Sequence, residues 1–318
     1  AFIAAAMAAV MTDIKRVVAY STISSLGLMT LALGVGGYAA GMYYLLNHAF
    51  FKALLFLAAG SVLHATNVFD IRHIRGLRGK MPITAITAFI GAYSLSGLPP
   101  LGGFWGKDEI LVASLAGGIV LFAMVLGVSF LTTFFTFRWF FSIFTGRPNE
   151  TAKHAHESPR VMTLPLIILA VGVFLVTLPT FMDFEGWILG WLPAATIASM
   201  PHAVGGHGFV VPMAVSLQLI ALYLAYSIYY RKSMSSDVFI SRFRPLHTLV
   251  LNKFYLDHIY VAFAERIIGG FSYLLHKFDL SVVDGIVNGI GIAFMRSGSK
   301  LKRIQTGLVQ DYASIVLL

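Results

Sequence analysis

The sequence predicts an all-α protein, a polytopic transmembrane bundle with one broken helix and one long amphipathic helix. Apolar residues make up 58% of the 318 residues and charged residues only 12%, a balance typical of membrane proteins. The apolar residues gather in runs of about 20, the length that spans the hydrocarbon of a bilayer. The sequence has no cysteine, so this chain can form no disulfide, thiolate zinc site or iron–sulfur cluster of its own.

Eight apolar segments are expected to lie in the membrane, and the charged residues fall mostly between them. The segments are 1–12 (partial), 17–36, 38–64, 82–116, 117–144, 161–180, 209–230 and a last one that starts near 309. Both ends of the sequence lie inside apolar runs. We therefore expect the chain to be part of a longer protein whose membrane helices continue beyond it.

The connections between these segments alternate between two faces of the membrane. Four connections on one face together carry 14 Lys and Arg, whereas the connections on the other face, near 37, 112–118 and 181–208, carry none. The positive-inside rule predicts that the basic face lies in the cytoplasm. This distribution accounts for the net charge of +9 without a nucleic-acid partner.

The segment 38–64 carries two ionisable side chains near its centre. His48 and Lys52 are four residues apart and therefore share one face of a helix. A lysine at mid-membrane costs at least about 2.5–3.5 kcal/mol on insertion scales, so it needs a wet or paired environment. Imidazole exchanges protons near working pH. These residues predict proton or ion conduction, and a structural ion pair of the lysine is the alternative.

The segment 82–116 is interrupted at its middle, because residues 97–103 contain two prolines and three glycines. A broken span is tolerated only where protein or water satisfies the freed backbone groups. Such breaks mark ion and substrate sites in transporters. Lys107 and Asp108 follow the break directly and are candidate site residues. The alternative is an ordinary charged loop at 104–109 between two short helices.

Three further features have ordinary explanations. Arg138 lies about 9 Å from the basic end of its segment and is expected to snorkel to the surface. His154 and His156 lack a third ligand at a fixed spacing, so they predict a solvated loop rather than a metal site. The loop 181–208 contains two tryptophans and is expected to be an interfacial segment with an aromatic belt.

From Asp257 to Arg303 the pattern changes to that of an amphipathic helix lying along a surface. Apolar residues recur every seven positions, and charged residues interrupt the stretch too often for a span. The recurring residues are Val261, Ile268, Leu275 and Val282. A continuous helix would be about 70 Å long. Six glycines leave open an alternative of two or three short interfacial helices.

Six stretches, in this order, resemble the large antiporter-like membrane subunit of respiratory complex I, chain L. They are TDIKRVVAYSTISSLG (Thr12–Gly27), NHAFFKALLFLAAGSV (Asn47–Val62), LRGKMP (Leu77–Pro82), SGLPPLGGFWGKDEIL (Ser96–Leu111), HESP (His156–Pro159) and RIQTGLVQDYA (Arg303–Ala313). The resemblance implies the second of two inverted five-helix repeats at 1–144, and additional transmembrane helices and loops at 145–256. It further implies a lateral amphipathic helix at 257–306 and the start of the final span at 307–318.

The resemblance implies a proton-translocating subunit of an NADH- or related donor:quinone oxidoreductase, with no redox chemistry in this chain. His48 and Lys52 match the relay histidine and lysine of the second half-channel. Lys107, with Asp108 beside it, matches the lysine on the broken helix near the channel exit. Where many relatives carry another histidine one turn before His48, this sequence has Tyr44, and tyrosine is a poor proton carrier at neutral pH.

The resemblance also implies what lies around the chain. Flavin, iron–sulfur clusters and quinone would belong to partner subunits, and this chain would hold no cofactor or metal. Partners would be other membrane subunits, including homologous antiporter-like subunits along the lateral helix, and the lipid of a bacterial or archaeal cell (inner) membrane. The basic loops and the lateral helix would face the cytoplasm. Two alternatives are the large subunit of a multi-subunit sodium/proton antiporter, which shares the repeat, and a non-conducting structural brace.

Overall fold

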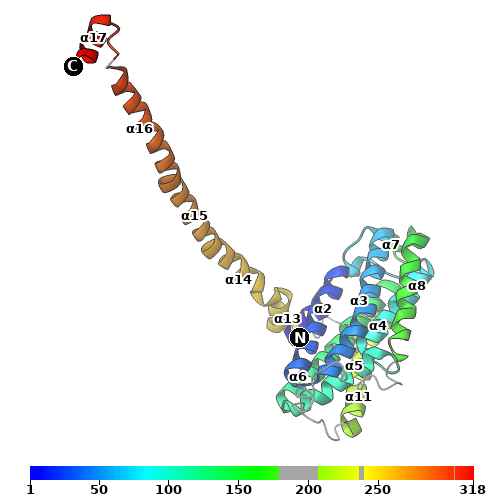
Figure 1. The fold of residues 1–318 in the computed structure, drawn as a ribbon. Helices are drawn as coiled ribbons and strands as arrows, with labels where there is room; N and C mark the ends of the chain where they lie inside the picture. Colours follow the sequence, from blue (N-terminus) through cyan, green and yellow to red (C-terminus); the bar gives the residue numbers. More distant parts are fainter. Residues whose placement is uncertain (179–206, 236–239, 304) are drawn as a thin grey trace. The chain divides into compact units, whose positions relative to one another are not determined.

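The computed structural model describes residues 1–178, 207–235, 240–303 and 305–318 (Figure 1). The chain divides into two units, Ala1–Asn252 and Lys253–Leu318. The expected interfacial segment at 181–208 lies outside the described residues, apart from the two residues with which α11 begins. Helices account for nearly all regular structure in the described residues, so the all-α prediction is confirmed.

The first unit contains every candidate site residue and is built from helices. Its helices are α1 (Phe2–Val10), α2 (Ile14–Gly34), α3 (Tyr38–Thr66), α4 (Pro82–Ser96), α5 (Gly102–Ala116), α6 (Ile119–Phe144), α7 (Glu150–Lys153), α8 (Arg160–Leu175), α11 (His207–Ala225) and α13 (Arg244–Leu251). A π-helical turn, η4 (Tyr226–Tyr230), extends α11. By length and composition, α2, α3, α6 and the extended α11 can each cross a membrane. These helices coincide with four of the eight predicted spans, those at 17–36, 38–64, 117–144 and 209–230.

The helix α3 lies at the centre of this unit and packs against α2, α4, α5 and α8 (Figure 1). Small residues allow these helices to approach closely, as is common between membrane helices. At Gly91 of α4, an added Cβ would lie 3.1 Å from the Cγ of Leu55 on α3. Because α3 carries His48 and Lys52, this packing removes both side chains from the outer surface of the bundle.

The four basic connections meet at one end of the unit. The N–H of Ile14 donates to the carbonyl of Phe69 at 2.8 Å, which joins the first connection to the second. The side chain of Asn149 donates to the carbonyl of His73 at 2.7 Å, which adds the third. The fourth shares a cavity with the second, described below. This convergence is what the alternation of charge in the sequence predicts.

Glu157 of the HESP stretch fastens the third connection to the start of α4. Its carboxylate accepts hydrogen bonds from the N–H of Ile83 at 2.7 Å and from the hydroxyl of Thr84 at 2.6 Å. A carboxylate at this position satisfies N–H groups that have no partner within the helix and interacts favourably with the helix dipole. Glu157 therefore fixes one end of the helix whose other end forms the break.

The predicted break is present, since α4 ends at Ser96 and α5 begins at Gly102. Gly97 follows α4 with a φ of +80°, a left-handed conformation that terminates helices and favours glycine. The peptide bond between Pro99 and Pro100 is cis. The two half-helices contact each other, and both contact α3 and α6. Residues 104–109 lie within α5, so the alternative of a charged loop there is wrong.

The second unit is one long helix followed by α17 (Val309–Leu317). The segments α14 (Leu256–Phe263), α15 (Gly269–Phe278) and α16 (Asp284–Lys302) continue into one another through two π-helical turns, at Ala264–Ile268 and Asp279–Val283. The helix runs through all six glycines, so the alternative of several short helices is wrong. One 18-residue window in it is nevertheless apolar enough to cross a membrane, so composition alone does not separate a surface helix from a span.

Candidate functional site

Lys52 is buried at the interface of α2 and α3, with 4% of its surface exposed. Its Nζ donates to the carbonyl of Val18 at 3.1 Å and is also hydrogen-bonded to the hydroxyl of Ser21. None of the ion pairs formed by the described residues involves Lys52. Its amine is thus held by neutral oxygens, so the described residues do not form the structural ion pair that was the alternative for Lys52.

His48 lies one turn before Lys52 and is also buried, with 7% exposed. Its ring meets the edge of Phe51 at 5.4 Å between centroids, and the Tyr44 ring lies 6.4 Å away. The Nε2 atom has no hydrogen-bond partner among the described residues. A buried polar atom left in this state is costly. Nε2 is therefore a position at which a water molecule would be hydrogen-bonded.

The hydroxyl groups of α2 run alongside the ionisable residues of α3. We call Ser21, Ser24 and Ser25 the serine face of α2. All three are buried. The hydroxyl of Ser25 lies 3.3 Å from that of Tyr44 on α3, and the hydroxyl of Ser24 has no partner among the described residues. The serine face was not predicted from the sequence, although its three serines all lie in the stretch YSTISS.

Lys107 lies at the break and closes the end of α4. Its Nζ donates to the carbonyls of Leu95 and Ser96, at 2.5 and 3.2 Å. The last carbonyls of a helix have no partner within it and carry partial negative charge, so a cation there is favourable. Thr133 of α6 donates to the same Ser96 carbonyl at 3.1 Å. Lys107 is therefore held by the broken backbone, with 4% of its surface exposed.

Two glycines make room for the Lys107 side chain and for α5. A Cβ on Gly97 would lie 2.7 Å from the Cδ of Lys107, and a Cβ on Gly102 would lie 1.9 Å from Oδ1 of Asn47 on α3. Because Asn47 precedes His48, the start of α5 lies against the face of α3 next to the histidine. A positive charge on Lys107 acts on both His48 and Lys52. The three basic groups therefore form one electrostatic cluster.

Gln218 of α11 completes the surroundings of Lys107 and was not found from the sequence. Its Nε2 lies 3.4 Å from the position that a Cβ added to Gly97 would occupy, next to the Lys107 side chain. The side chain is buried, and its Oε1 has no partner among the described residues. Asp108 is buried next to Lys107 on α5. The structure thus brings all four sequence-predicted site residues into the interior of one bundle and adds an amide to them.

Two other sequence expectations have different outcomes. Arg138 does not snorkel, because only 7% of it is exposed. Its Nη1 donates to the carbonyl of Ala9 at 2.7 Å, and its guanidinium carbon lies 5.8 Å from the centre of the Tyr229 ring. The end of α1 supplies an acceptor that sequence spacing did not reveal. His154 and His156 are exposed, and the described part of the chain has no group of three or more potential metal ligands.

These features define a class of protein: a polytopic helical membrane protein whose buried lysines and histidine surround a broken span. Residues 1–136 match the family described as NADH:quinone oxidoreductase/Mrp antiporter, transmembrane. Residues 1–136 therefore carry the domain of this family, and the chain is similar over almost its whole length to membrane subunits of quinone oxidoreductases and of an F(420)H(2) dehydrogenase.

The curated relatives are subunits of quinone oxidoreductases and a related dehydrogenase. The chain is 36% identical to NAD(P)H-quinone oxidoreductase chain 5 of Picosynechococcus sp., over 99% of this chain and 53% of that one. It is 36% identical to F(420)H(2) dehydrogenase subunit L of Methanosarcina mazei, over 100% and 52%. It is 35% identical to NADH-quinone oxidoreductase subunit L of Neisseria meningitidis, over 97% and 51%. The chain therefore spans about half the length of these relatives.

Solved structures share the fold at lower identity. The Mrp complex from Dietzia sp. matches with a TM-score of 0.60 and 24% identity, over 90% of this chain and 33% of that chain. Respiratory complex I from Thermus thermophilus with bound NADH matches with a TM-score of 0.53 and 20% identity, over 70% and 42%. The arrangement of helices is therefore common to both kinds of complex.

Proposed function

We propose that this chain is part of a proton-translocating membrane subunit of a redox-driven quinone oxidoreductase. The observation that carries the proposal is the set of contacts made by the two buried amines. Lys52 and Lys107 are held by backbone carbonyls and a hydroxyl, so each amine is stabilised when charged and is not fixed in that state by an ion pair. The family domain at residues 1–136 and the similarity of the chain to subunits of quinone oxidoreductases support the same function.

The side chains would carry protons between neighbouring groups. Lys52 exchanges a proton with His48 through water that contacts both Nε2 of His48 and the serine face. Protonated Lys107 is stabilised by the carbonyl end of α4. Because like charges repel strongly in a medium of low dielectric constant, a change of charge on Lys107 changes the proton occupancy of His48 and Lys52. Asp108 lies beside Lys107 and completes the proposed relay.

The surroundings of the subunit follow from the same proposal. Protons enter from the basic face, which lies in the cytoplasm by the positive-inside rule, and leave on the opposite face of the cell membrane. Flavin, iron–sulfur clusters and quinone are bound by partner subunits. Residues 1–144 form the second antiporter-like repeat and 145–256 the additional helices and loops. The helix at 257–306 contacts homologous membrane subunits, and 307–318 begin the final span.

The test is a Lys52→Met variant in the full-length subunit, assembled in its complex and reconstituted in vesicles. We expect quinone reduction to continue while the number of protons moved per electron falls. The matched control is Lys80→Met, which removes a lysine from an exposed position of the second basic connection. An unchanged proton-to-electron ratio in Lys52→Met would refute the relay.

The large subunit of a sodium/proton antiporter is the second candidate, because the matching family includes Mrp antiporters. It predicts sodium transport across the vesicle membrane without an electron donor, and co-purification without flavin or iron–sulfur subunits. A structural brace predicts that substitutions at Lys52 and Lys107 change assembly but not the proton-to-electron ratio. The experiment above therefore separates all three functions when sodium flux and subunit composition are measured with it.

A further inference from the structure

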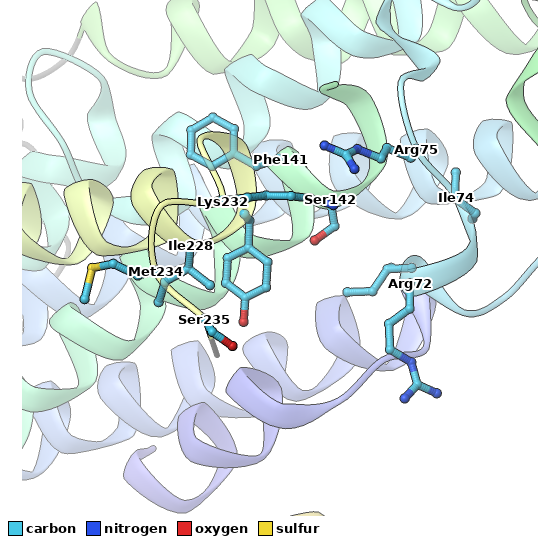
Figure 2. Close-up of a pocket in the computed structure, with 11 residues that line it drawn as sticks. Arg72, Ile74, Arg75, Phe141, Ser142, Ile228, Lys232, Met234 and Ser235 are labelled. Carbon is cyan, nitrogen blue, oxygen red and sulfur yellow. The ribbon is translucent and has the colours of Figure 1, made fainter. Parts of the chain in front are cut away.

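A cavity of about 420 Å³ opens at the basic end of the first unit, away from the buried lysines. Three separate parts of the chain line it: the connection after α3, the end of α6 and the π-helical turn that extends α11. Figure 2 shows Arg72, Ile74 and Arg75 on one side, and Ile228, Lys232, Met234 and Ser235 on the other. The cavity therefore lies beside the second basic connection, at the ends of α6 and of the extended α11.

The cavity carries more positive charge than its neighbours neutralise. Arg72 is paired with Asp70, with 2.6 Å between Nη2 and Oδ2. Arg75 and Lys232 also line the cavity, and neither has an ion-pair partner among the described residues. Arg138 lies behind the Tyr229 ring that forms part of the wall. Among the described residues, the cavity therefore has two cations without an ion-pair partner at its rim and a third behind it, which attract an anion.

Apart from Ser142, Ser235 and the hydroxyl of Tyr229, the remaining lining is apolar. Ile74 is fully buried, while Phe141 and Ile228 are half-buried and flank the opening. Phe141 is held in place by the rings of Tyr226 and Tyr230, at 6.0 and 5.9 Å between centroids. An inorganic anion would contact the cations and leave these walls facing water. A ligand with an anionic head and an apolar tail would satisfy both parts of the lining.

We propose that this cavity binds the phosphate-bearing headgroup of an anionic phospholipid. The phosphate would lie between Arg75 and Lys232, and the first part of an acyl chain would pass along Ile228 and Phe141. Basic pockets between membrane helices at the positively charged face are suited to such headgroups. Because the lining joins α6 to the turn after α11, the bound lipid would hold these two elements together. The proposal does not depend on the proton relay.

The experiment uses the full-length subunit assembled in its complex, in nanodiscs of phosphatidylcholine. A small fraction of the lipid is phosphatidylglycerol that carries a photoactivatable group, and cross-linked peptides are quantified by mass spectrometry. We expect the peptide containing residues 226–235 to be labelled about tenfold more by this lipid than by photoactivatable phosphatidylcholine. The double variant Arg75→Gln with Lys232→Gln should lower the affinity for this lipid about 25-fold, because each cation near the membrane contributes about fivefold. Its labelling should therefore fall to the level seen with photoactivatable phosphatidylcholine.

The control variant is Arg78→Gln with Lys80→Gln, which removes two charges from exposed positions of the same connection but not from the cavity. It should leave the labelling within about twofold. Lys232→Gln alone, at an exposed position, provides the same test if the double variant fails to assemble. Equal labelling by the two lipids, or equal loss in both double variants, would overturn the site. Displacement of the lipid by a millimolar excess of inorganic phosphate would assign the cavity to free phosphate instead.

Discussion

The amine of Lys107 lies 2.5 Å from the carbonyl oxygen of Leu95, so a cation on α5 closes the end of α4. The two residues are on opposite sides of the break, and the contact joins the half-helices through a group that can lose its proton. The proton state of Lys107 and the stability of the break are therefore coupled. The other buried lysine, Lys52, also donates to a backbone carbonyl, that of Val18, but this carbonyl lies inside α2 rather than at the end of a helix.

A first prediction separates the charge of Lys107 from its ability to release a proton. Lys107→Arg keeps a cation at the end of α4, but arginine remains protonated in proteins. We expect the variant complex to assemble. Its free energy of unfolding should lie within about 1 kcal/mol of that of the native protein, while its proton-to-electron ratio falls. Lys107→Met removes the cation and should lower both the stability and the proton-to-electron ratio. A normal proton-to-electron ratio in Lys107→Arg would show that this lysine only stabilises the break.

A second prediction tests the serine face of α2. Ser21→Ala removes the hydroxyl that is hydrogen-bonded to Lys52. Among the described residues, the Val18 carbonyl is then the one remaining hydrogen-bond partner of the amine. We expect the proton-transfer rate to fall at least tenfold, with a smaller change in Ser21→Thr because it keeps a hydroxyl. The matched control is Thr22→Ala, whose hydroxyl donates to the same carbonyl but does not contact the lysine. Equal effects of both alanine substitutions would exclude a specific role for Ser21.

Much of the fold follows from the sequence, because apolar run length and loop charge depend on local composition alone. Runs of about 20 apolar residues located α2, α3, α6 and α11, and the prolines and glycines located the break between α4 and α5. The burial of His48, Lys52 and Lys107 follows from the cost of placing charge against lipid. These inferences need no knowledge of which helices are neighbours.

The missing parts of the site depend on neighbours. Gln218 lies more than 100 residues from Lys107 in the chain, and no local pattern connects the two. The acceptor of Arg138 is a backbone carbonyl of α1, and any residue type can provide a carbonyl. The serine face of α2 has the spacing of a helix face, but small residues at such positions also serve close packing alone. Only the arrangement of the helices distinguishes these roles.

A third prediction concerns the space beside Lys107. Gly97→Ala places a Cβ 2.7 Å from the lysine Cδ, at a residue with a φ of +80°. We expect a loss of at least about 1–2 kcal/mol of stability from the left-handed backbone, together with a lower proton-to-electron ratio because the lysine is displaced. The control is Gly79→Ala, where an added Cβ meets no atom within 4 Å. Thermal melting of the purified complex and proton pumping in vesicles are measured for both variants.

A last prediction concerns acid stability at the basic end of the bundle. Hydrogen bonds from the Arg72 guanidinium lower the pKa of Asp70 below its usual value. A carboxyl group with a lower pKa in the folded state stabilises that state above its unfolded pKa of about 3.9, and this contribution is lost as the pH falls through the folded value. The Asp70 side chain is partly exposed, so the contribution stays within about 1 kcal/mol.

Arg72→Gln should therefore lower the melting temperature at pH 7, and its difference from the native protein should shrink as the pH falls below the unfolded pKa. Arg78→Gln, an exposed arginine in the same connection, should show no such dependence on pH. A difference between Arg72→Gln and the native protein that stays constant down to acid pH would mean that Arg72 stabilises the basic end by packing. The ion pair with Asp70 would then not be what fixes the connection that lines the cavity.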